Sequence, residues 1–226
     1  LRMDDHENRV RQRRGPETVV RMSIAGLARS GAVAGAIKLA SAGLSFLMFV
    51  VVAMVTDERQ FGLYSATYAG ASLVSFFASI GQQSTVLRFW PQYAEGNDLR
   101  SAHGLMGYAI AVAFAGVAVT SLLVIALGFA PYVGERTPEW TPLCLSAAVL
   151  SFALGWSEFA SGAFRAKGAL VSGLLPRDVI WRAGVIALVL AMHFFGTKVG
   201  AVAATLITAG VLLAAVLPQT IILLAD

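Results

Sequence analysis

The chain has 226 residues, of which 57% are hydrophobic and 13% are charged, and its mean hydropathy is +0.72. A soluble domain of this length needs roughly a quarter charged residues to cover its surface, so this composition excludes an ordinary soluble protein. The net charge of +4 and the pI near 9.6 reflect excess Lys and Arg, which in a membrane chain indicate orientation and contact with membrane lipids, and we expect no nucleic-acid partner.

Residues 1–30 predict a basic cytosolic tail. Apolar residues from Val19 to Ala28 recur at roughly helical spacing among arginines, which is typical of a helix lying on the inner leaflet. A solvated tail that only sets orientation explains the same residues. The apolar run that follows is longer than the ~7–15 residues of a signal-peptide core, so we expect it to remain as an uncleaved span.

Six apolar tracts follow the tail. A transmembrane helix needs about 20 mostly apolar residues, because ~30 Å of hydrocarbon is crossed at about 1.5 Å per residue. The runs are continuous and do not alternate in segments of ~10 residues, which disfavours a membrane β-barrel. We therefore expect an all-α integral membrane protein in which residues 31–226 form a bundle of about six transmembrane helices, over 31–56, 61–87, 104–132, 141–164, 176–196 and 199–225.

The fifth tract has the shortest uncharged stretch, from Ala183 to Thr197. Pro176 suits the first position of a helix, so we expect the span to begin there, with Trp181 as an interfacial anchor. Arg182 then has to extend its side chain toward the lipid headgroups.

The distribution of Lys and Arg orients the bundle, because cytosolic segments of membrane proteins retain these residues. With six spans and an inside N-terminus, Lys38 lies within the first span, and the outer loops hold only Arg59, Arg136 and Lys198 of the 17 basic residues. The sequence thus predicts a multi-pass protein of the cell (inner or plasma) membrane with a cytosolic N-terminus.

The residues that mark enzymes and metal sites are missing or scattered. Cys144 is the one cysteine, so the chain can form no internal disulfide or thiolate cluster. No Gly-rich phosphate loop and no H-E-x-x-H motif occurs, and the three histidines lie in different segments. We therefore expect no enzymatic activity, no cofactor and no metal site.

Two charges lie inside the expected spans. Lys38 follows Gly31, and Glu158 precedes Arg165, by the same number of residues, which places both about 10 Å deep from the inner side. A charge at that depth is costly and needs a partner, another helix or a wet cavity. Lys38 either binds a ligand or extends to the headgroups. Glu158 either couples an ion or forms an ion pair with Lys38 or with Arg165.

Two stretches of the sequence carry a family pattern. The first has an acidic turn, an F-G-x-Y start to the second span at 61–64, a small-residue turn at 79–81 and a basic, aromatic stretch at 86–93. The second reads GAFRAKGALVSGLLPRDVIWRAG and joins spans four and five. Together they cover about half of the chain. In order and spacing they resemble the polysaccharide and oligosaccharide flippases of the multidrug/oligosaccharidyl-lipid/polysaccharide exporter superfamily.

The resemblance implies a protein that flips a lipid-linked oligosaccharide intermediate across the inner membrane for polysaccharide biosynthesis, by alternating access. Such a substrate is carried on a diphosphate, whose negative charge Lys and Arg can hold. By position, Lys38 is the first candidate substrate-binding residue, and Arg88 and Arg165 are candidates at the cytosolic mouth. Contact with lipid phosphate is the alternative for the two arginines.

Members of this family have two lobes around a central cavity, whereas this chain holds the equivalent of the first lobe. The resemblance therefore requires a missing second lobe or a homodimer as partner. Two alternative functions stay open. A cation-coupled multidrug exporter of the same superfamily predicts a carboxylate-rich cavity, and a non-transporting membrane scaffold predicts paired charges with no opening between helices.

Overall fold

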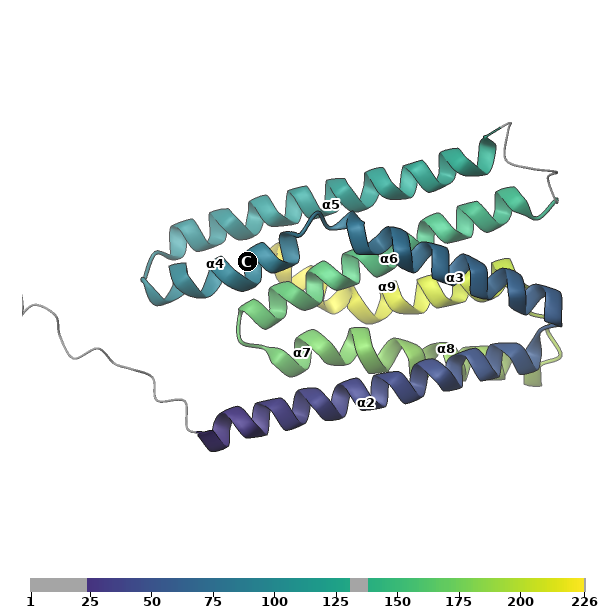
Figure 1. Ribbon diagram of the computed structural model, residues 1–226, viewed down its shortest axis with the longest axis horizontal. Coiled ribbons are helices and arrows are strands. Elements are labelled where there is room, and N and C mark those ends of the chain that lie inside the picture. The colour runs from purple at the N-terminus through teal and green to yellow at the C-terminus, as the bar shows by residue number, and fades with distance from the viewer. Residues whose placement is uncertain (1–23, 131–137, 226) are drawn as a thin grey trace, which may run out of the picture. The chain divides into compact units, whose positions relative to one another are not determined.

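The computed structural model describes residues 24–130 and 138–225, with side chains from Gly31 onward, and every regular element in these ranges is a helix (Figure 1). The chain divides into two compact units, residues 1–33 and 34–226. In the first unit, the described residues form the start of α2 (Ile24–Val55). The predicted surface helix around Val19 lies mostly outside the described residues.

The second unit contains the rest of α2 and all the other described elements. In chain order these are α3 (Glu58–Ala78), α4 (Gln82–Glu95), α5 (Leu99–Phe129), α6 (Trp140–Ala166), α7 (Leu170–Leu175), the π-helical turn η1 (Pro176–Ile180), α8 (Trp181–Phe194) and α9 (Ala201–Ala225).

Among the described residues, four helices are long and apolar enough to cross a membrane: α2 from Gly31 to Val55, α5, α6 and α9. A fifth crossing results if α3 and α4 count as one bent span. This assignment rests on length and composition. It confirms the predicted all-α fold with several helices that suit a multi-pass membrane protein.

The predicted second span, 61–87, is not one straight helix. α3 ends at Ala78, α4 begins at Gln82, and the two helices are bent by 42° at the break. The break falls in the predicted small-residue turn at 79–81. The sequence predicts this turn near the end of the second span. In the structure the turn instead divides the span into two helices.

The predicted start of the fifth span, at Pro176, lies after the observed start of the helical segment. The chain is already helical from Leu170, and Pro176 lies inside the helical segment instead of at its start. The segment consists of α7, η1 and α8, with 6, 5 and 14 residues, and none of these is long enough to cross a membrane by itself. The count among the described residues is therefore four or five candidate spans, not six.

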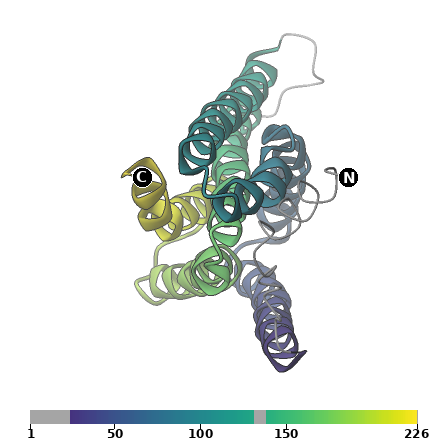
Figure 2. The same ribbon diagram turned by 90° about the vertical axis from the view of Figure 1, so that its left-hand side faces the viewer.

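α6 is the central helix of the second unit. It packs against α3, α4, α5, α7 and α9, and its green ribbon runs through the middle of the unit in Figure 2. Small residues permit this packing. A Cβ on Gly155 would lie 3.0 Å from Val117 and 3.2 Å from Ala78, and a Cβ on Gly162 would lie 2.3 Å from the side chain of Gln83. Neighbouring helices therefore approach where a larger side chain would not fit.

Polar side chains join α3, α6 and α9 at one end of the bundle. Arg59 lies 2.9 Å from a carboxylate oxygen of Glu139, and Gln60 Nε2 donates to the same carboxylate at 3.2 Å. Gln60 Oε1 also accepts a hydrogen bond from the N–H of Ala201 at 2.7 Å, which satisfies a donor in the first turn of α9. The sequence predicts that this end lies outside the cell.

The two halves of α2 differ in packing. Between residues 34 and 47, Ile37 and Ser41 are buried, and the other side chains are exposed or half-buried. From Met48 to Val52 the helix enters the core, where the ring of Phe49 packs edge-on against Tyr68 at 5.2 Å between ring centres. The second half of α2 is therefore held by apolar packing that its first half lacks.

Candidate functional site: a charged cleft among apolar helices

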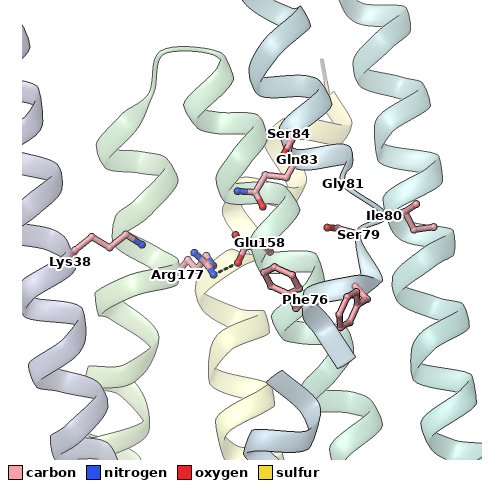
Figure 3. A pocket seen from close by; sticks show the side chains of 10 residues that line it. Lys38, Phe76, Ser79, Ile80, Gly81, Gln83, Ser84, Glu158 and Arg177 are labelled. Atoms are coloured by element: carbon pink, nitrogen blue, oxygen red, sulfur yellow. Dashed lines mark hydrogen bonds and ion pairs between the residues drawn. The ribbon is translucent and has the colours of Figure 1, made fainter. Parts of the chain in front are cut away.

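A cleft of about 850 Å³ opens among the helices of the second unit. Its walls come from the first half of α2, the junction of α3 and α4, α6 and η1 (Figure 3). Lys38, Glu158 and Arg177 are its charged lining residues. The other lining residues are aromatic, aliphatic or small and polar: Phe76, Phe77, Ser79, Ile80, Gly81, Gln83 and Ser84. Charged groups thus gather in a bundle whose helices are otherwise apolar, which is typical of a functional site in a membrane protein.

One wall of the cleft is the break between α3 and α4. Ile80 and Gly81 have φ angles of 49° and 71°, in the left-handed region that a β-branched residue such as Ile rarely adopts. α5 packs closely on this break, because a Cβ on Gly116 would lie only 2.3 Å from the carbonyl oxygen of Ala78. Close packing of the surrounding backbone therefore holds a strained turn at the cleft.

Another wall is the π-helical turn that begins at Pro176. Proline has no N–H, so the carbonyl oxygen of Ser172 loses its usual helical partner. Gln219 on α9, which is 3% exposed, donates its Nε2 to that oxygen. The N–H of Trp181 bonds to the carbonyl oxygen of Pro176, five residues back instead of four. The wider turn holds the arginine and the aspartate that follow the proline beside the cleft.

Four charged side chains form a continuous series of ion pairs at the cleft. Lys38 Nζ lies 2.7 Å from Asp178 Oδ2. Arg177 Nη1 lies 3.7 Å from Asp178 Oδ1, and Arg177 also bonds the carboxylate of Glu158 (Figure 3). Asp178 is the buried member, with 5% of its side chain exposed against 57% for Lys38. Two positive and two negative charges neutralise one another, which lowers the cost of placing each in a region of low dielectric.

Arg182 adds a fifth charge behind these ion pairs. Its Nη1 donates to the carbonyl oxygen of Asp178 at 2.6 Å and to that of Arg177 at 3.2 Å. Its guanidinium lies 4.6 Å from the centre of the Trp181 ring. Arg182 thus bonds the backbone of its own helical segment and stabilises the π-helical turn. Its extension toward the lipid headgroups stays a prediction.

The structure brings Lys38 and Glu158 to the same cleft, as their equal depth predicts, but it gives each a different partner. Lys38 pairs with Asp178, and Glu158 pairs with Arg177 in place of the expected pairing with Lys38 or Arg165. The physical reason is the early start of the fifth helical segment. It moves two charged residues from the membrane interface into the bundle.

The two predicted mouth residues lie outside the cleft lining. Arg88 is exposed on α4, with its guanidinium 5.4 Å from the centre of the Phe89 ring. Arg165 is half-buried near the end of α6, where its Nε lies 3.4 Å from the carbonyl oxygen of Ser161. A role in substrate binding stays a prediction for both.

Sequence reasoning misses Arg177 and Asp178 as site residues, because a proline before them favours a helix start. The signal that could have found them is the apolar stretch before the proline. Leu170, Val171, Leu174 and Leu175 recur at helical spacing, which is typical of a helix that continues through Pro176.

No protein-family model, curated protein or solved structure matches this chain. Within the part of the chain that the structure describes, no group of three or more His, Cys, Asp and Glu residues could hold a metal ion. The ion pairs of the cleft offer groups that can change partners. Lys38 can exchange its carboxylate partner for an anionic ligand, and Glu158 can exchange its arginine for a cation or a proton.

Proposed function

We propose that this protein is one lobe of a membrane transporter that flips a lipid-linked oligosaccharide intermediate for polysaccharide biosynthesis, by alternating access. The observation that most supports this is the cleft, where Lys38 and Arg177 offer positive charge among apolar helices. A diphosphate carried on a lipid needs such charge, and apolar helices suit its hydrocarbon tail. The resemblance of two sequence stretches to flippases points to the same function.

The ion pairs leave room for such a substrate. The side chain of Lys38 is 57% exposed, and its partner Asp178 has a second cation, Arg177, at 3.7 Å. An anionic substrate that takes Lys38 from Asp178 leaves that carboxylate beside Arg177, which it then shares with Glu158.

Two further parts of the proposal rest on sequence. The distribution of basic residues supports the cell inner or plasma membrane and a cytosolic N-terminus. The two-lobed pattern of the resembling family supports a second lobe or a second copy of the chain as partner.

A cation-coupled multidrug exporter is the second candidate, and Glu158 is the observation that favours it. Its carboxylate lines the cleft and is 33% exposed, so a cation could reach it. A membrane scaffold predicts both paired charges and no opening between the helices. The charges at the cleft are paired, as it predicts, but a cleft opens between the helices, which it does not predict.

Substrate binding to the purified chain tests the proposal without a second lobe. The full chain in nanodiscs is titrated with a polyprenyl-diphosphate-linked oligosaccharide, and Kd is measured. We expect saturable binding that Lys38→Gln weakens by about tenfold, the effect of losing one charge-assisted hydrogen bond, while Lys38→Arg retains more affinity. Arg100→Gln, which changes an exposed arginine that does not line the cleft, is the matched control and should bind like the parent.

The same assay separates the two candidates. Equal affinity for an uncharged polyprenol-linked sugar, or parental affinity in Lys38→Gln, would remove the flippase proposal. A cation-coupled exporter instead predicts that a cationic drug binds in competition with sodium ions or protons, and that Glu158→Gln abolishes this competition.

A further inference from the structure

A second groove, separate from the charged cleft, runs between α5 and α9. Both helices pack against α6, which forms the floor of the groove. Its apolar part has a volume of about 550 Å³ and is lined by the rings of Phe114, Phe152 and Trp156 together with Leu217. None of these residues lines the charged cleft.

The apolar part of this groove is held in shape by contacts within the chain. Trp156 Nε1 donates to Thr220 Oγ1 at 2.8 Å, so the polar atom of the indole is satisfied and the ring offers an apolar face. Phe114 packs edge-on against Phe152 and Trp156, with ring centres 5.8 and 6.0 Å apart. Phe114 is nevertheless 51% exposed, so the groove opens at the surface of α5, a helix long and apolar enough to cross a membrane, and an alkyl chain can enter it there.

A lysine and a histidine line one end of the groove. A smaller cavity of about 250 Å³ shares Ile110 and Leu224 with the apolar part, and His103 and Lys167 line it. Lys167 Nζ lies 5.1 Å from the centre of the Trp90 ring. Lysine and tryptophan together are typical of the level of the lipid headgroups.

The separation of the two ends matches one leaflet of a bilayer. On α5 the groove extends from His103 to Phe114, and on α6 from Lys167 to Trp156. Each interval corresponds to about 16 Å of helix. Half of the hydrocarbon core is about 15 Å thick. A cation at the headgroup level and aromatic rings near the bilayer centre therefore line one continuous path.

We propose that this groove is a binding site for one anionic phospholipid, with its phosphate at Lys167 and an acyl chain along Phe114 and Trp156. Charge complementarity selects an anionic headgroup over a zwitterionic one. The apolar path of leaflet length selects a lipid over a free phosphate. The site is independent of the proposed transport, because it shares no lining residue with the charged cleft.

Native mass spectrometry of the full chain tests this site. The protein in detergent is titrated with phosphatidylglycerol, and the fraction carrying one bound lipid is measured. We expect phosphatidylglycerol to bind about fivefold more tightly than phosphatidylcholine of the same acyl chains, and Lys167→Gln to remove this preference. Ala111→Phe, which fills the apolar part from an exposed position on α5, should lower the binding of both lipids.

Two variants outside the groove serve as controls. Arg100→Gln removes a charge from an exposed position near the start of α5, and Ala69→Phe adds a ring to an exposed position on α3. Both should bind lipid like the parent, and all variants should elute as the parent does in size-exclusion chromatography. Equal binding of the two lipids to the parent, parental binding in Ala111→Phe, or displacement of the lipid by glycerol phosphate at equal concentration would each overturn the proposal. Lys167→Arg should restore the preference for phosphatidylglycerol, and its failure to do so would contradict a charge-based site.

Discussion

Gln219 on α9 donates a hydrogen bond to the carbonyl oxygen of Ser172 on α7, the acceptor that Pro176 leaves without its helical partner. A side chain of one helix thus completes the backbone of another. The bond is made next to the π-helical turn that holds Arg177 and Asp178 at the cleft. The geometry of the charged cleft therefore depends on a residue that does not line it.

Replacing Gln219 by Leu should lower the free energy of unfolding by about 0.5–1.5 kcal/mol, because it removes the hydrogen bond to the carbonyl oxygen that Pro176 leaves without its helical partner. Unfolding by sodium dodecyl sulfate in mixed micelles measures this loss. Gln92→Leu, at an exposed position, is the control and should have little effect. Adding Pro176→Ala restores a backbone donor for Ser172, so the cost of Gln219→Leu should shrink in that background. An equal cost in both backgrounds would show that the proline is not the reason for this hydrogen bond.

The ion pairs predict which charged residues are energetically coupled. Double-mutant cycles for Lys38→Met with Asp178→Asn, and for Arg177→Met with Glu158→Gln, should give coupling energies of about 0.5–3 kcal/mol. A cycle for Lys38 with Glu158 should give a smaller value, because these two residues have other partners. A larger coupling in the Lys38–Glu158 cycle than in the other two would contradict the arrangement at the cleft.

Gly116→Ala should destabilise the protein by about 1–3 kcal/mol, because the added methyl group meets the carbonyl oxygen of Ala78. Gly104→Ala is a matched control on the same helix. A Cβ at this exposed glycine meets nothing within 4 Å, so the higher helix propensity of alanine should leave stability unchanged or slightly raised. Thermal unfolding of the two variants in one detergent compares them directly. Similar midpoints would mean that α5 can move away from the break between α3 and α4.

The predicted orientation is tested by labelling single cysteines in a Cys144→Ser background. Cysteines at Arg59 and at Arg136, which lies outside the described residues, should react with an impermeant maleimide added to intact cells. Cysteines at Arg100 and Lys167 should react only after the membrane is opened, because the basic segments are expected inside. Labelling of position 167 from outside would reverse or break the predicted topology.

Asp98 predicts a pH dependence of stability at the start of α5. Its carboxylate accepts a hydrogen bond from the N–H of Ser101 at 3.1 Å, and bonds from the side chain and backbone of Ser101 lower its pKa from the ordinary value of 3.8. The stabilisation is therefore present above that ordinary value and is lost as pH falls through the lowered pKa. Asp98→Ala should reduce the unfolding midpoint at pH 7, and the gap to the parent should narrow at acid pH. A gap of constant size down to acid pH would exclude the charge as its cause.

Hydropathy and spacing predict much of this fold, because they act locally along the chain. The long apolar helices α2, α5, α6 and α9 appear close to the predicted boundaries. The same reasoning places Lys38 and Glu158 at one depth, and the structure lines one cleft with both.

The parts that the sequence did not predict depend on contacts between distant residues. A proline alone does not say whether a helix starts or continues, and at Pro176 the outcome depends on Gln219 from another helix. Likewise, the turn around Ile80 requires the close approach of Gly116. The partners of Lys38 and Glu158 then follow from the position of the π-helical turn. A helix start predicted at Pro176 therefore also predicts the wrong partners for both residues.

Because the two halves of α2 pack differently, water in the cleft affects the first half more than the second. Apolar contacts hold the second half of the helix, whereas in the first half Lys38 forms an ion pair with Asp178 at the edge of an open cleft. An ion pair at 4 Å is worth about four times more at an effective dielectric constant near 20 than in bulk water. Water in the cleft therefore weakens the attraction between Lys38 and Asp178, and its exclusion strengthens that attraction.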